Sequence, residues 1–179
     1  MFDELLTYLL NFTNLTKYYS IISSMNKSNE FTQKDIGLIT TYQSGIAQAS
    51  AHRVMNRMVS DYLVRYDMTA MQWFVIGYVH DAGEAGVTLT DLGNVLGTSF
   101  PYTTNIINLL ESKGIISKKV HAQDGRTKLV TVNKEHTDMV NEIEAGLREE
   151  LRKTLYNTDN ISREELQTYI RVLYKIIHA

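Results

Sequence analysis

The chain has 179 residues, 44% of them hydrophobic and 21% charged, a size and composition that predict a single folded domain and exclude a largely disordered chain. Cysteine is absent, which excludes disulfides and thiolate metal sites. The formal net charge of -2 argues against a uniformly basic nucleic-acid-binding protein, but residues 86–134 carry six Lys and Arg against three Asp and Glu, so positive charge is concentrated there.

The first segment, "MFDELLTYLLNFTNL", is acidic where a secretion signal would be basic, and no apolar run approaches the length of a membrane span. We therefore expect a cytoplasmic protein without membrane contact.

Helices should dominate because the chain has a single proline, Pro101, and apolar residues recur at spacings of three and four. The expected helices up to the middle of the chain are 2–23, then, after a polar joint, 34–66, 69–82, 88–97 and 99–113.

Three helix starts carry the spacing of a capping box, in which a hydroxyl side chain precedes a second polar side chain by three positions. The aspartate of the second pair makes a shorter version of the motif. The pairs are Thr69 with Gln72, Thr88 with Asp91, and Ser162 with Glu165.

Strands are predicted only around residues 115–132, where "ISKKVHA" and "TKLVTV" flank an Asp-Gly pair that favours a tight turn. The order from residue 69 is helix, helix, tight turn, helix, hairpin, which is the order of a winged helix-turn-helix. Gly97 is expected to end the first helix of the pair in a left-handed conformation, and Ser99 is expected to cap the second.

Two further helices are expected after the hairpin, each with an apolar stripe. Such a stripe usually packs within its own subunit, but this chain has helices to spare beyond the winged lobe. The stripes are Val140, Ile143, Leu147, Leu151 and Leu155, and Leu166, Ile170, Leu173 and Ile177.

Four motifs follow one another in the order and with the gaps of a known family: "MTAMQWFVI", "VTLTDLGNVLGTS", "TTNIINLLESKGII" and "DGRTKLVTVN". Over roughly residues 45–179 the chain resembles the MarR family of bacterial and archaeal transcription regulators. The resemblance implies a homodimer whose N- and C-terminal helices form the interface while two winged lobes bind double-stranded DNA. The expected segments are an N-terminal helical extension and polar joint (1–33), a long helix contributing to the dimer region (34–67), the winged helix-turn-helix DNA-binding lobe (68–136) and C-terminal dimerisation helices (137–179).

In the expected recognition helix, Thr103, Ile106, Ile107 and Leu110 recur at helical spacing and should face inward. The other face is polar, and it lacks the basic residue that the family usually carries near the middle of this helix. Asparagine can bond an adenine edge and threonine can contact a thymine methyl, so we expect an A/T-leaning half-site. An ordinary solvated helix face is the alternative. The expected DNA contacts are Ser99, Pro101, Tyr102, Thr104, Asn105 and Asn108.

The resemblance implies that the wing arginine, Arg126, contacts the minor groove or the DNA backbone and that Asp124 orients it. Clustered cations around it would add affinity that falls with salt, because they release counterions from the duplex. An ordinary hairpin with an incidental arginine is the alternative. The expected wing contacts are Lys118, Lys119, His121, Asp124, Arg126 and Lys128.

Family members bind small aromatic acids between the winged lobe and the dimer helices. The resemblance therefore implies a pocket for a small aromatic or anionic effector in the region of Arg57, Tyr62, Tyr66 and Trp73. Core packing and ordinary surface charge are the alternative for these four residues.

No glycine-rich phosphate loop, nucleophile elbow or paired-carboxylate motif is present in the sequence, and the five histidines are scattered. We therefore expect no enzyme activity, no cofactor and no metal. The expected function is a sequence-specific transcription regulator, a repressor that binds a palindromic operator as a homodimer and is released by a small-molecule effector. The alternative is a winged-helix protein interaction module without specific DNA binding, which the acidic chain and the non-basic recognition helix favour.

Overall fold

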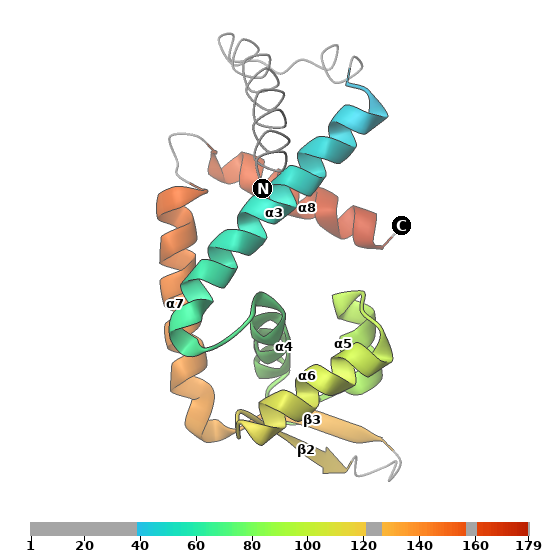
Figure 1. Ribbon diagram of the computed structural model, residues 1–179, viewed down its shortest axis with the longest axis vertical. Helices are drawn as coiled ribbons and strands as arrows, with labels where there is room; N and C mark the ends of the chain where they lie inside the picture. Colours follow the sequence, from blue (N-terminus) through green and yellow to red (C-terminus); the bar gives the residue numbers. More distant parts are fainter. Residues whose placement is uncertain (1–38, 121–126, 157–160, 179) are drawn as a thin grey trace, which may run out of the picture. The chain divides into compact units, whose positions relative to one another are not determined.

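The structure is a computed structural model, and it describes residues 39–120, 127–156 and 161–178 (Figure 1). The helix expected at 2–23 and the polar joint lie outside the described residues, as do the wing residues His121, Asp124 and Arg126. The chain divides into two compact units, residues 1–51 and 52–179.

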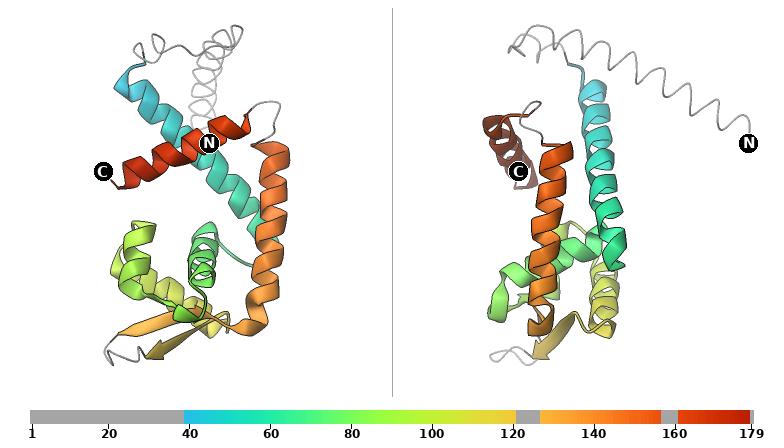
Figure 2. Two further views of the ribbon diagram at one scale, coloured as in Figure 1. Left: turned by 180° about the vertical axis from the view of Figure 1, so that it is seen from behind. Right: turned by 90° about the vertical axis from the view of Figure 1, so that its left-hand side faces the viewer.

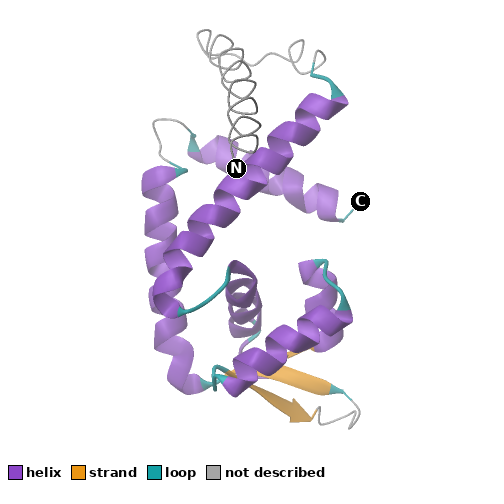
Figure 3. Ribbon diagram, viewed as in Figure 1, coloured by secondary structure: helices purple, strands orange, loops and turns teal. Residues whose placement is uncertain are grey.

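Figure 3 shows a mainly helical chain with one small sheet in its described part, which confirms the predicted fold class. In the described ranges, three single-turn 3-10 helices, η1, η2 and η3, connect the longer elements. The elements are α3 (Thr41–Leu63), η1 (Val64–Tyr66), α4 (Ala70–Asp81), η2 (Gly83–Ala85), β1 (Val87–Thr88), α5 (Leu89–Leu96), α6 (Phe100–Ser112), β2 (Ile116–Val120), β3 (Lys128–Val132), η3 (Lys134–His136), α7 (Thr137–Thr154) and α8 (Arg163–Ile177).

In the first unit the structure describes the beginning of α3, which starts later than the predicted residue 34. Thr40 precedes the helix, and its backbone N–H donates to Gln43 Oε1 at 2.9 Å while Gln43 N–H donates back to Thr40 Oγ1 at 3.4 Å. This reciprocal pair satisfies amides that the first turn leaves without helical partners.

In the second unit, the predicted caps at Thr69 and Ser162 both form complete capping boxes, which confirms these two helix starts. At α5, the Thr88 side chain accepts from Asp91 N–H at 3.1 Å and also donates to Asp91 Oδ2 at 2.7 Å. The cap predicted at Ser99 is wrong: Ser99 is the residue before α6, but its side chain makes no capping hydrogen bond.

The sheet has three strands in the order β1-β3-β2, so it contains one strand more than the expected hairpin. The added strand, β1, pairs antiparallel with β3 through Val87 opposite Val130. Gly86 leads into it with φ of 66°, and a Cβ there would lie 2.8 Å from the Val130 carbonyl oxygen. Glycine therefore permits both the left-handed backbone and the close approach of this segment to β3.

The core of the second unit lies where α4, α5 and α6 meet the sheet, and α7 packs against α4. Figures 1 and 2 show α4, α5 and α6 on one side of β2 and β3. The most deeply buried aliphatic side chains are Leu63, Val75, Ile76, Val79, Leu92, Ile107, Leu110, Ile116, Val130 and Ile143.

The described part of the chain contains no helix with the length and apolar character needed to cross a bilayer.

The two C-terminal helices differ in burial. In α7, Val140, Ile143 and Leu147 of the predicted stripe are buried. In α8 no residue is buried, although its apolar and polar residues are strongly segregated. The apolar face of α8 is thus exposed in the single chain, with Ile170 45% and Leu173 37% accessible.

Candidate nucleic-acid interface

The turn between α5 and α6 has the geometry of a helix-turn-helix. Gly97 ends α5 in the left-handed conformation, with φ of 60° and ψ of 33°, as the sequence predicts. Thr98 N–H then donates to the Gly93 carbonyl at 3.1 Å, which closes the end of the helix. Pro101 lies in the first turn of α6, where its missing N–H breaks no helical hydrogen bond.

The inward face of α6 is the predicted one, since Thr103, Ile106, Ile107 and Leu110 are all buried. Thr103 has no exposed surface, and its hydroxyl lies 2.8 Å from the Thr98 hydroxyl and 3.2 Å from the Ser99 carbonyl. These bonds satisfy the one polar side chain on the inner face, and they hold α6 to the turn.

The outward face of α6 carries the remaining predicted contacts. Pro101, Tyr102, Asn105 and Asn108 are exposed, while Thr104 is half-buried and donates its hydroxyl hydrogen to the Phe100 carbonyl at 2.9 Å. That bond leaves the Thr104 methyl group and hydroxyl lone pairs for outside contacts. Two apolar side chains on this helix, Phe100 and Leu109, are also exposed.

Lys118, one of the predicted wing cations, contacts two side chains of α6. Its Nζ lies 2.6 Å from Glu111 Oε2 and 2.6 Å from Asn108 Oδ1, and its side chain is only 16% exposed. The side chain thus ties β2 to α6, and Glu111 offsets its charge. We call Lys118, Asn108 and Glu111 the α6–β2 brace.

The other described wing cations face solvent. Lys119 on β2 and Lys128 on β3 are both exposed, and Lys128 pairs with Val120 at the end of the ladder. They flank the segment that holds the remaining predicted wing contacts.

A second link that the sequence does not reveal fixes the C-terminal end of α6. Lys113 Nζ donates to the Asp67 carboxylate at 2.7 Å and to the Asp67 carbonyl at 2.8 Å. Asp67 follows η1 with a positive φ of 50°, which aspartate tolerates better than most residues. The hydrogen bond and the charge of Lys113 hold the pKa of the Asp67 carboxyl below its usual range.

The four expected effector residues occupy different environments. Tyr62 and Trp73 belong to the hydrophobic core, at 8% and 6% exposure. Arg57 is exposed and faces Asp61 at 3.8 Å. The Tyr66 hydroxyl donates to Glu142 Oε1 at 3.1 Å, and hydrogen bonding to Tyr62, partial burial and the Glu142 carboxylate raise the pKa of Tyr66 to about 12.

A helix-turn-helix with one buried and one exposed face, a sheet packed against it and a wing formed by β2 and β3 define a winged helix-turn-helix protein. A family model described as the MarR family matches residues 66–127. This match spans α4, β1, α5, α6 and β2, so the winged helix-turn-helix segment is similar to that of the MarR family.

The fold is similar to solved structures over most of the chain. The apo form of MarR from E. coli is 23% identical, with a TM-score of 0.62, over 78% of this chain and 97% of that chain. MepR from S. aureus, solved as a DNA complex, is 24% identical, with a TM-score of 0.63, over 78% and 98%. CouR from Rhodococcus jostii RHA1, solved with p-coumaroyl-CoA, is 16% identical, with a TM-score of 0.67, over 74% and 90%.

Proposed function

We propose that this protein is a transcription regulator that binds a palindromic DNA site as a homodimer and represses the genes it controls. The observation that carries the proposal is the exposed polar face of α6 directly after the helix-turn-helix turn, with the opposite face fully used in the core. The MarR-family match and the solution of the similar MepR on DNA support it.

Base readout is assigned to three side chains of α6. Asn105 is exposed and can bond an adenine edge through both amide atoms, which is worth roughly 1–3 kcal/mol of discrimination. Tyr102 and the methyl group of Thr104 would add apolar contacts, most favourably to thymine methyl groups. Together they predict a half-site rich in A and T.

Phosphate binding is assigned mainly to the wing, because α6 carries no basic residue before Lys113. Lys119, Lys128 and Arg126 would supply charge that releases counterions, with Asp124 and His121 beside them. Lys118 is assigned a bracing role instead, since Glu111 already offsets its charge.

Dimerisation is assigned to the C-terminal helices, with the long helix expected at 34–67 contributing. The exposed apolar face of α8 supports this, because a second copy of the chain would bury side chains such as Leu173 that the single chain leaves accessible. Light scattering coupled to gel filtration tests it: Leu173→Lys should give monomers at micromolar concentration. Thr168→Lys adds the same charge on the polar side of α8 and should leave the dimer intact.

The central experiment is a fluorescence-anisotropy titration of promoter DNA from beside the gene, repeated over a range of salt. Asn105→Ala should cost roughly 1–3 kcal/mol at one base position, whereas Lys119→Gln should weaken binding to every sequence and reduce the salt slope by about one. Asn141→Ala, another exposed helix asparagine, is the control. Repression is tested with a reporter placed behind the bound promoter.

Effector release is proposed for a small aromatic or anionic molecule. Arg57 and the half-buried Tyr66 are accessible candidates, with Tyr62 and Trp73 as the packed support behind them. CouR, which shares the fold, was solved with an aromatic thioester, p-coumaroyl-CoA, and this supports the ligand class. Loss of DNA affinity on adding benzoate or a coumaroyl thioester would test it.

A protein interaction module is the second candidate, because Phe100, Tyr102 and Leu109 expose apolar surface on α6, at 57%, 48% and 44%. The same titration decides between the two functions. A steep log-log salt slope supports DNA binding, and the absence of binding or of a slope supports the interaction module.

A further inference from the structure

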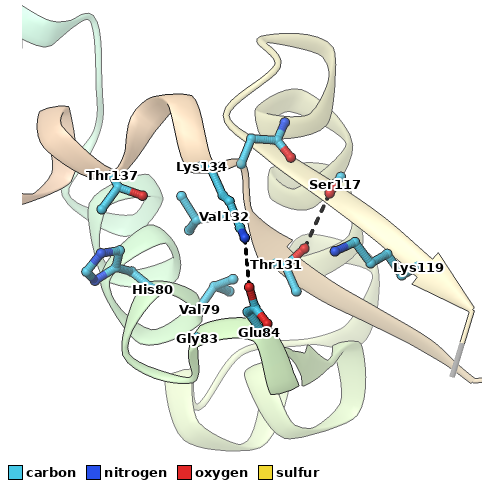
Figure 4. Close-up of a pocket in the computed structure, with 11 residues that line it drawn as sticks. Val79, His80, Gly83, Glu84, Ser117, Lys119, Thr131, Val132, Lys134 and Thr137 are labelled. Carbon is cyan, nitrogen blue, oxygen red and sulfur yellow. Dashed lines mark hydrogen bonds and ion pairs between the residues drawn. The ribbon is translucent and has the colours of Figure 1, made fainter. Parts of the chain in front are cut away.

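A pocket of about 570 Å³ lies on the face of the wing sheet formed by Ser117, Lys119 and Thr131 (Figure 4). The end of α4 and η2 form one wall, and η3 with the start of α7 forms another. This volume falls within the roughly 300–1,000 Å³ of pockets that hold small molecules. Its lining includes His80, Glu84, Lys119, Thr131, Lys134 and Thr137.

Most groups around the pocket are hydrogen-bonding side chains. The Ser117 and Thr131 hydroxyls lie 3.3 Å apart across the paired strands, and each has capacity for a further hydrogen bond. Val79 and Val132 supply the apolar part of the lining. A ligand here would be small and polar.

Two lysines act on one carboxylate at this pocket. Lys134 Nζ lies 2.8 Å from Glu84 Oε1. The hydrogen bond and charge of Lys134, and then the charge of Lys119, hold the pKa of Glu84 below its usual range. Lys119 has no ion pair of its own among the residues that the structure describes. The lining therefore holds one positive charge more than Glu84 offsets, with histidine counted as neutral.

The bond between Lys134 and Glu84 can be exchanged at small cost. The two side chains are 89% and 85% exposed, and such ion pairs contribute little because water screens them. An anion that enters the pocket can therefore take the place of Glu84 and contact both lysines at once.

We propose that this pocket binds a small organic anion, with its carboxylate or phosphate group held by Lys119 and Lys134 and its polar body against Ser117, Thr131 and Thr137. The site is separate from the region of Arg57 and Tyr66. It joins three segments, since Lys119 belongs to the wing, Lys134 leads into α7 and Glu84 follows α4. Its regulatory consequence, a changed position of the wing on DNA, rests on the proposed function; the binding itself does not.

The test is a titration of the full chain, without DNA, with citrate, benzoate and inorganic phosphate in turn, followed by backbone amide NMR. At least one anion should shift the amides of Ser117, Thr131 and Thr137 saturably. The double variant Lys119→Gln/Lys134→Gln should weaken that binding at least tenfold. Lys153→Gln, which removes another exposed lysine in an ion pair, here with Glu149, should leave it unchanged.

Glu84→Gln provides a result of opposite sign, because it removes the competing carboxylate and should tighten anion binding severalfold. The proposal is overturned if none of the three anions shifts these amides, or if the double variant binds as the parent does. It is also overturned if the double variant loses DNA affinity while no free anion binds, since the lysines would then serve DNA phosphates. Failure of DNA binding alone would overturn the proposed function and leave the pocket result standing.

Discussion

Gly146 on α7 lies against the ring of Tyr62 on α3, so the substitution Gly146→Ala tests how tightly these two helices pack. A Cβ at residue 146 would overlap the Tyr62 hydroxyl oxygen and would lie 3.0 Å from Tyr62 Cζ. Tyr62 is 8% exposed and belongs to the core, so its ring cannot turn freely into solvent. The added methyl group therefore forces a shift of buried atoms.

Two opposed effects set the change in the free energy of unfolding that Gly146→Ala should cause. Replacing glycine by alanine inside a helix stabilises a protein by roughly 0.5–1 kcal/mol. Overpacking a core costs roughly 1–3 kcal/mol. The expected net effect of Gly146→Ala on the free energy of unfolding is therefore a loss of about 0–2.5 kcal/mol, which lowers the melting temperature by up to roughly 10 °C in a chain of this size.

The assay is urea and thermal unfolding at one fixed protein concentration, because dimerisation makes stability concentration-dependent. Gly77→Ala is the matched control: Gly77 lies within α4 and a Cβ there meets nothing within 4 Å, so this variant should gain about 0.5–1 kcal/mol. Tyr62→Phe removes the overlapping oxygen and should recover part of the loss in the double variant. The packing argument is refuted if Gly146→Ala is as stabilising as Gly77→Ala.

Three further outcomes are expected. Thr103→Val should lower the free energy of unfolding by about 1 kcal/mol, seen in urea unfolding, because it breaks buried hydrogen bonds at the start of α6. The pKa of Tyr66 is raised in the folded chain to about 12, from an ordinary 10.0. The contribution of Tyr66 to the free energy of unfolding is therefore complete below pH 10.0 and is lost as the pH rises from 10.0 to about 12. When urea unfolding midpoints are measured across this pH interval, Tyr66→Phe should reduce the fall of the midpoint with rising pH. Glu142→Gln should move that fall to lower pH. Glu111→Gln should steepen the salt dependence of DNA binding by about one unit because the Glu111 carboxylate then no longer offsets the charge of Lys118; an unchanged slope would contradict the brace.

The helix starts are readable from the sequence because capping is local. Thr69 and Gln72 are three residues apart, so both partners of the cap stand within one turn of chain. The inward face of α6 is equally readable, since helical spacing alone places Thr103 with its apolar neighbours. Ser99 shows the limit of this reasoning, because the right residue type stands before α6 without making the bond.

Features that depend on contacts between distant parts of the chain cannot be predicted from local sequence in this way. The strand β1 is two residues long, too short to show a period, and it exists only because β3 pairs with it. Lys118 looks like a free cation in the sequence, since its partners lie seven and ten residues away on another element. The apolar stripe of α8 is predictable from its spacing, but the spacing alone does not say whether the stripe packs within its own subunit or is exposed in the single chain.

The α6–β2 brace also limits how this protein could be given a new target sequence. A recognition helix transplanted whole from another winged-helix protein would leave Lys118, with its side chain only 16% exposed, without Asn108 and Glu111. Retargeting should therefore exchange Tyr102, Thr104 and Asn105 while residues 108 and 111 are retained. The surface of α6 thus separates into positions open to redesign and positions committed to holding the wing in place.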